Sequence, residues 1–153
     1  MIDKRTPPPP GTLVLVVRRA INASPERLFD AWTRSEELIA WWGPRPVRCT
    51  NAEVDLRVGG RYHIENLLPT GDVLTIEGAF TLIERPRKLV YTWSVAPGRA
   101  PPELVTVRFD QKGPSLTEVV VTHERIQSEA IRDSHTNGWN GCLDGLELHV
   151  TSN

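Results

Sequence analysis

Cysteine is scarce in this sequence, because its 153 residues include only Cys49 and Cys142. Two cysteines cannot form a disulfide framework, so we expect a reduced, cytoplasmic protein. The amino terminus has no apolar stretch of the kind found in a secretory signal. No apolar run approaches the roughly 18 residues that a membrane span requires. We therefore expect neither secretion nor contact with a membrane.

An excess of charge of one sign is also missing. The chain has 18 Lys and Arg against 19 Asp and Glu, which gives a formal net charge of -1. Proteins dedicated to nucleic acid, and polybasic membrane modules, carry a marked positive excess. The balance therefore argues against a nucleic-acid partner.

The linear motifs of common catalytic and cofactor sites are absent as well. There is no GxGxxG after a strand, no GxSxG, no HExxH and no CxxC. The histidines His63, His123, His135 and His149 are scattered, without the spacing of a metal site. We therefore expect no metal, no cofactor and no catalysis, although an acid–base pair inside a cavity would leave no linear motif.

What the sequence does have is a pattern of apolar residues that predicts a tail, two short helices and a series of strands. Residues 1–11 contain four consecutive prolines and are expected to be an extended or disordered tail, followed by a single domain over 12–153. Two short helices are predicted, capped by Ser24 and Ser35, the second ending at Gly43. Strands are predicted over residues 13–19, 53–58, 61–66, 74–82, 89–95, 104–109 and 116–124, with a two-residue turn at Gly59 and Gly60 and a loop over 96–102.

The carboxyl end, residues 128–149, changes to an apolar residue at every third or fourth position, which predicts a long helix. The order predicts an α+β fold, in which one curved antiparallel sheet of about seven strands wraps around that helix. Side chains alone need not fill the space that such a sheet encloses with the helix. We therefore expect a cavity between sheet and helix, opening near the short helices.

Three glycines, Gly138, Gly141 and Gly145, lie along the edge of the apolar face of this helix. Each costs roughly 1 kcal/mol relative to alanine in a helix. We expect their small size to allow close approach to the sheet, to a ligand or to a second copy of the chain in a homodimer.

Four stretches resemble a known family: RRAINASPERLFDAWT at 18–33, ELIAWWGP at 37–44, VDLRVGGRYH at 54–63 and HTNGWNGCLDGLELHV at 135–150. They are similar to the domain named after the activator of Hsp90 ATPase, within the START/Bet v 1-like (SRPBCC) helix-grip superfamily. The resemblance implies a helix-grip fold with a central cavity. It implies no single activity, because members include co-chaperone domains and lipid or polyketide binders, and related branches contain cyclases.

The inward faces of the predicted elements give the expected cavity. Trp41 and Trp42 are expected near its entrance, and polar atoms of Tyr62, Asn66 or His123 are expected to orient a ligand. The remaining walls are expected from the strand residues Ile64, Ile76, Tyr91, Trp93, Val107 and Val121 and the helix residues Trp139, Cys142, Leu143 and Leu146.

Three functions follow from these observations. A small hydrophobic or amphipathic molecule bound in the cavity is the leading interpretation. A chaperone-associated or regulatory interaction module is the first alternative, although no motif in the sequence itself supports a chaperone partner. A cyclase- or hydrolase-type enzyme using the same cavity is the second.

Overall fold

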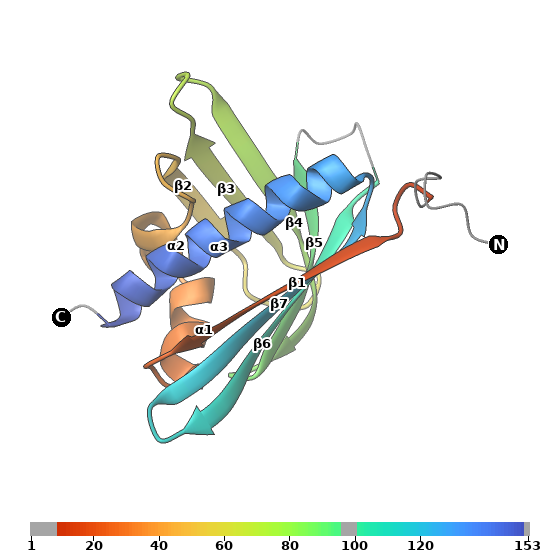
Figure 1. Ribbon diagram of the computed structural model, residues 1–153. Coiled ribbons are helices and arrows are strands. Elements are labelled where there is room, and N and C mark those ends of the chain that lie inside the picture. Colours follow the sequence, from red (N-terminus) through yellow and green to blue (C-terminus); the bar gives the residue numbers. More distant parts are fainter. Residues whose placement is uncertain (1–8, 96–100, 152–153) are drawn as a thin grey trace.

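The computed structural model describes residues 9–95 and 101–151 (Figure 1). Most of the expected tail and of the expected loop over 96–102 therefore lies outside the described residues. The elements are β1 (Leu13–Ile21), α1 (Pro25–Thr33), α2 (Ser35–Trp41), β2 (Arg48–Val54), β3 (Arg61–Leu67), β4 (Val73–Glu84), β5 (Lys88–Val95), β6 (Glu103–Gly113), β7 (Leu116–Ile126) and α3 (Glu129–Thr151).

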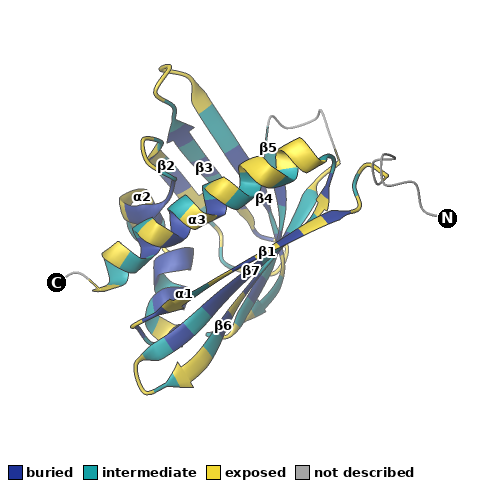
Figure 2. Ribbon diagram, viewed as in Figure 1, coloured by how far each residue is buried: buried dark blue, intermediate teal, exposed yellow. Residues whose placement is uncertain are grey.

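The seven strands form one antiparallel sheet in the order β1-β7-β6-β5-β4-β3-β2. The sheet curves around α3, whose carboxyl-terminal half lies beside α1 and α2 (Figure 1). Trp139, Cys142, Leu143 and Leu146 on α3 are buried against the sheet, whereas the opposite side of the helix is exposed (Figure 2). The predicted α+β helix-grip fold is confirmed.

A single residue separates the two short helices. Ser24 caps α1, because its Oγ accepts a hydrogen bond from the backbone N–H of Arg27, and Pro25 occupies the first helical position. The predicted cap of α2 is wrong, since Ser35 is already helical and the N-cap is Arg34, which makes no side-chain cap hydrogen bond. Arg34 has an extended backbone and ends α1 while it begins α2, so no position is left for a separate cap.

The predicted strand over 53–58 is also wrong. Strand β2 begins earlier, at Arg48, and its pairing with β3 ends at Val54 opposite Tyr62. After Asp55, which still donates to the carbonyl of Arg61, the chain turns: Gly60 donates to Arg57, and Gly59 donates to the carbonyl of Phe80 on β4. A Cβ on Gly60 would lie 2.1 Å from the Asp55 carbonyl oxygen, so this close turn requires glycine.

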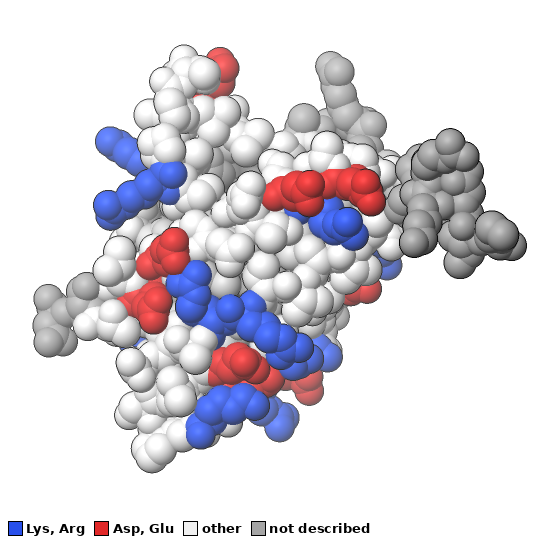
Figure 3. Space-filling model, viewed as in Figure 1, with Lys and Arg blue, Asp and Glu red and all other residues white. Residues whose placement is uncertain are grey.

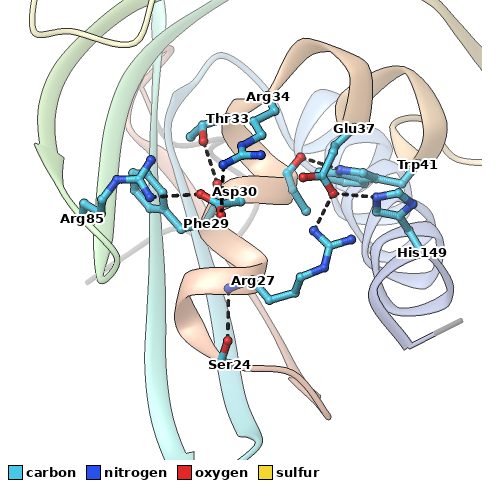
Figure 4. A network of polar contacts seen from close by, with 11 residues as sticks. Ser24, Arg27, Phe29, Asp30, Thr33, Arg34, Glu37, Trp41, Arg85 and His149 are labelled. Atoms are coloured by element: carbon cyan, nitrogen blue, oxygen red, sulfur yellow. Dashed lines mark hydrogen bonds and ion pairs between the residues drawn. The ribbon is translucent and has the colours of Figure 1, made fainter. Parts of the chain in front are cut away.

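Polar contacts connect the three helices near the carboxyl-terminal end of α3 (Figure 4). Glu37 on α2 accepts from Arg27 on α1, and His149 on α3 places its Nε2 2.9 Å from the same carboxylate. Although burial alone would raise the pKa of Glu37, these two hydrogen bonds lower it. The carboxyl-terminal end of α3 is thereby held against the helix pair.

The surface agrees with the balanced charge of the sequence. On the face shown in Figure 3, Lys and Arg side chains lie next to Asp and Glu side chains rather than in a field of one sign. Among the described residues, the helices are too short or too polar to cross a lipid bilayer.

Candidate functional site

A cavity of about 770 Å³ lies between α3 and strands β3 to β6. Its inner wall is mostly apolar, with Ile76 and Trp93 from the sheet and Trp139 from the helix. Exposed lining residues mark its mouth, among them Arg45 on the α2–β2 connection and Asn137 on α3. The cavity lies within the 300–1,000 Å³ range of typical small-molecule sites.

The structure divides the expected cavity residues into three groups. Those that line the cavity are Trp42, Asn66, Ile76, Trp93, Trp139 and Cys142. Those around a second hollow of only about 20 Å³ include Tyr62, Ile64 and Tyr91, together with Trp42. Those that line neither space, and are buried in the core, are Trp41, Val107, Val121, His123, Leu143 and Leu146.

Aromatic side chains of the short helices explain this division. Trp32 on α1 stacks on Trp139 with ring centroids 6.0 Å apart, and its Nε1 donates to the hydroxyl of Tyr91. Trp41 packs against Trp32 and donates its own Nε1 to the carbonyl of Ala31. Side chains therefore fill the space between α3 and the sheet at the α1–α2 end, and the cavity lies toward the amino-terminal half of α3.

The hydroxyl of Tyr62, expected to orient a ligand, instead donates to the carbonyl of Thr92 over 2.6 Å. Desolvation raises the pKa of both Tyr62 and Tyr91. Both hydroxyls therefore stay protonated and belong to the packed end of the grip.

A cluster of polar side chains occupies the other end. Oε1 of Glu103 lies 2.6 Å from Nε2 of His123 and 2.9 Å from Nε2 of His135. On the far side of the His123 ring, Trp139 donates its Nε1 to Nδ1 over 3.0 Å. The two imidazoles stack with centroids 4.5 Å apart, and Trp93 packs edge-on against both.

The tryptophan determines where the proton of His123 lies. An indole N–H only donates, so Nδ1 of His123 must carry the lone pair and Nε2 the proton. His123 therefore donates to Glu103, and both of its ring nitrogens are used within the protein. Burial lowers the pKa of His123, which keeps the ring neutral. Burial would raise the pKa of Glu103, but the hydrogen bonds from His123 and His135 lower it to about 2.

The same cluster brings together three residues that could bind a metal, because the donor atoms of Glu103, His123 and His135 lie within 4.8 Å of one another. A metal on Nε2 of His123 would move the proton of that ring to Nδ1. The N–H of Trp139 would then face another N–H at 3.0 Å, where metal-bound histidines normally find an acceptor. The arrangement fits a hydrogen-bonded carboxylate better than a metal centre.

Two buried polar atoms of the cavity wall have no hydrogen-bond partner among the described residues: Oδ1 of Asn66 and Nε1 of Trp93. Asn66 is 2% exposed and Trp93 is 7% exposed. Leaving such a group unpaired costs about 1–3 kcal/mol. Two cavity-lining residues therefore hold one acceptor and one donor that no described residue satisfies.

Sequence reasoning missed Trp32 and Glu103 as site residues and gave His135 no role in the site. Strand alternation contained the signal for Glu103, because Glu103, Val105 and Val107 share one strand face and both valines are fully buried. The position of Trp32 follows from the packing of α1 against the sheet, which the helix pattern alone does not specify.

Comparison with known proteins agrees with the fold. The pattern of the family described as "Activator of Hsp90 ATPase homolog 1-like protein" matches residues 22–151. A Chromobacterium violaceum protein of solved structure is similar over 92% of this chain and 98% of its own, with 24% identity and a TM-score of 0.82. An HSP90 activator from Plasmodium falciparum is similar over 88% and 94%, with 26% identity and a TM-score of 0.69. No protein with a curated description matches.

Proposed function

This chain belongs to the activator of Hsp90 ATPase homolog 1-like family, and we propose that it binds a small amphipathic molecule in the cavity between α3 and the sheet. We place this binding in the cytoplasm, as the scarcity of cysteine suggests. The observation that carries the proposal is a cavity of about 770 Å³ whose lining residues hold two polar atoms that no described residue satisfies.

The wall supports binding through apolar contact. Ile76, Trp93 and Trp139 line the cavity with apolar side chains. Each Å² of apolar ligand surface that leaves water contributes roughly 25 cal/mol, so a ligand that buries about 200 Å² would gain on the order of 5 kcal/mol. The amide oxygen of Asn66 and the indole N–H of Trp93 have no hydrogen-bond partner among the described residues. A ligand with polar groups can hydrogen-bond to them, so they favour an amphipathic molecule over a pure hydrocarbon.

Gly138 offers a direct test, because it lines the cavity and a Cβ added there would meet no atom of the described residues within 4 Å. A Gly138→Phe side chain should occupy the cavity without a backbone clash. We expect the neutral probe N-phenyl-1-naphthylamine to bind the wild-type protein saturably and to bind Gly138→Phe at least tenfold more weakly.

The matched control is Asn140→Phe, which adds the same ring to an exposed position of the same helix outside the cavity. It should bind the probe like the wild type. If the probe does not bind the wild-type protein, or binds a folded Gly138→Phe equally well, the proposed function is wrong.

The likeness to the Plasmodium falciparum HSP90 activator favours a second candidate function, in which the chain docks on a chaperone. The test is the ATPase rate of purified Hsp90 with and without this protein. A saturable increase that persists in Gly138→Phe would support docking through the surface rather than through the cavity. An unchanged rate would remove this candidate.

A further inference from the structure

The polar end of the cavity pairs an acceptor with a donor on neighbouring strands. Glu103 on β6 lies directly opposite Trp93 on β5 in the strand register, and both line the cavity. Both imidazoles of the cluster bond to Oε1 of Glu103, and among the described side chains none bonds to Oε2. Nε1 of Trp93 has no acceptor in the described part of the chain. A carboxylate oxygen and an indole N–H at this end of the cavity therefore both lack a partner among the described residues.

We propose that this end of the cavity selects a ligand whose head group is neutral and both donates and accepts a hydrogen bond, as a hydroxyl or a primary amide does. This inference rests on the ligand binding proposed above. The head group donates to Glu103 and accepts from Nε1 of Trp93. The apolar remainder of the ligand lies against Ile76 and Trp139.

Other head groups leave the pair unsatisfied. An anionic carboxylate or phosphate would accept from Trp93 but face the ionised Glu103 in a partly desolvated space, where repulsion is screened weakly. An ammonium group would pair with Glu103 but provide no acceptor for Trp93. Arg45 could attract an anion, but it is exposed at the mouth, where solvated ion pairs contribute little.

The histidines act on the ligand through Glu103. His123 uses both ring nitrogens within the protein, so it has no free atom for a ligand and is a positioning residue. Together with His135 it fixes Oε1 and keeps the carboxylate ionised. Glu103 and Trp93 are therefore the residues assigned to head-group specificity.

The test uses four ten-carbon probes, 1-decanol, decanamide, decanoate and decylamine, each displacing N-phenyl-1-naphthylamine from the full chain at pH 7.5. We expect 1-decanol and decanamide to bind at least tenfold more tightly than decanoate and decylamine. In Glu103→Gln, decanoate should gain at least tenfold relative to 1-decanol, because the repelling charge is gone. In Trp93→Phe, 1-decanol should weaken several-fold while decylamine changes little.

Glu129→Gln is the matched control, because it makes the same chemical change at an exposed carboxylate of α3 and should leave the order of affinities unchanged. If Glu103→Gln does not fold, the order of the four probe affinities in the wild-type protein and the affinities of Trp93→Phe still test the inference. Failure of N-phenyl-1-naphthylamine to bind would remove the proposed function and this inference together. Probe binding with no displacement, with equal affinities or with decanoate tightest would overturn this inference alone.

Discussion

The indole Nε1 of Trp139 donates to Nδ1 of His123 over 3.0 Å, and the two side chains are 3% and 0% exposed. The contact joins the aromatic cluster of the core to the polar end of the cavity. It fixes the proton of His123 on Nε2, from which the ring donates to Glu103. One helix residue therefore determines the hydrogen bonding of a carboxylate on the facing strand.

Replacing Trp139 with phenylalanine should raise the pKa of His123. In the wild-type protein a proton on Nδ1 would face the indole N–H, and the variant removes that conflict. The unfolding free energy should fall by about 2–4 kcal/mol, since a buried acceptor loses its donor and a smaller ring leaves space. NMR titration of the His123 ring and chemical denaturation measure the two effects.

Trp41→Phe provides the comparison for this variant. Trp41→Phe also loses an indole hydrogen bond, to the carbonyl of Ala31, but the aromatic rings against Trp41 are those of Trp32 and Trp42. It should destabilise the fold without moving the pKa of His123. An equal pKa change in both variants, or none in Trp139→Phe, would contradict the role assigned to Trp139.

Acid should destabilise the protein through Glu103. Its pKa is lowered from 4.5 to about 2, so the unfolded chain takes up the proton first as the pH falls. The stabilisation is complete above pH 4.5 and is lost as the pH falls toward 2. At roughly 1.4 kcal/mol per pKa unit it amounts to about 3 kcal/mol.

Glu103→Gln should accordingly show a flatter fall of unfolding free energy between pH 4.5 and 3 than the wild-type protein. The lowered pKa of His123 acts in the same direction, beginning below pH 6.5. Denaturation curves at several pH values measure both regions, with Glu129→Gln as the control. Parallel pH profiles for Glu103→Gln and the wild type would show that Glu103 is not held ionised by its neighbours.

The three helix glycines should respond differently to alanine. A Cβ on Gly141 would lie 2.4 Å from Cβ of Pro44, and a Cβ on Gly145 would lie 2.6 Å from the carbonyl oxygen of Trp41. Alanine at either position should cost about 1–3 kcal/mol. Gly138→Ala has open space around it and should gain up to about 1 kcal/mol through helix propensity. Thermal unfolding of the three variants checks the order, which equal effects would contradict.

Asn66→Leu should stabilise the protein while it weakens ligand binding. The substitution removes the unpartnered Oδ1, and the amide loses only a hydrogen bond of 3.4 Å from Nδ2 to the carbonyl of Leu74. We expect a gain of about 1 kcal/mol in unfolding free energy. A loss of stability with unchanged probe affinity would show that Asn66 is structural rather than a binding residue.

Periodicity was enough to predict the sheet, the long helix and the inward position of Asn66 and Trp93, because burial repeats with the pitch of each element. The same alternation would also have placed Glu103 on the inward face of its strand, which it shares with Val105. It could not show that Trp32 fills the space between α3 and the sheet beside α1, or that Trp139 donates a hydrogen bond to His123. Those contacts depend on the angle at which each helix crosses the sheet, which local sequence does not determine.

The most direct measurement of cavity binding follows the indole N–H signals of the five tryptophans by NMR as 1-decanol is added. Nε1 of Trp41 is bonded to Ala31 and that of Trp139 to His123, whereas that of the cavity-lining residue Trp93 has no partner within residues 9–95 and 101–151. The account predicts a saturable downfield shift of the Trp93 signal as it gains an acceptor, with the Trp41 signal unmoved. A Trp93 signal that stays in place at saturating 1-decanol, with shifts confined to exposed surface residues, would contradict it.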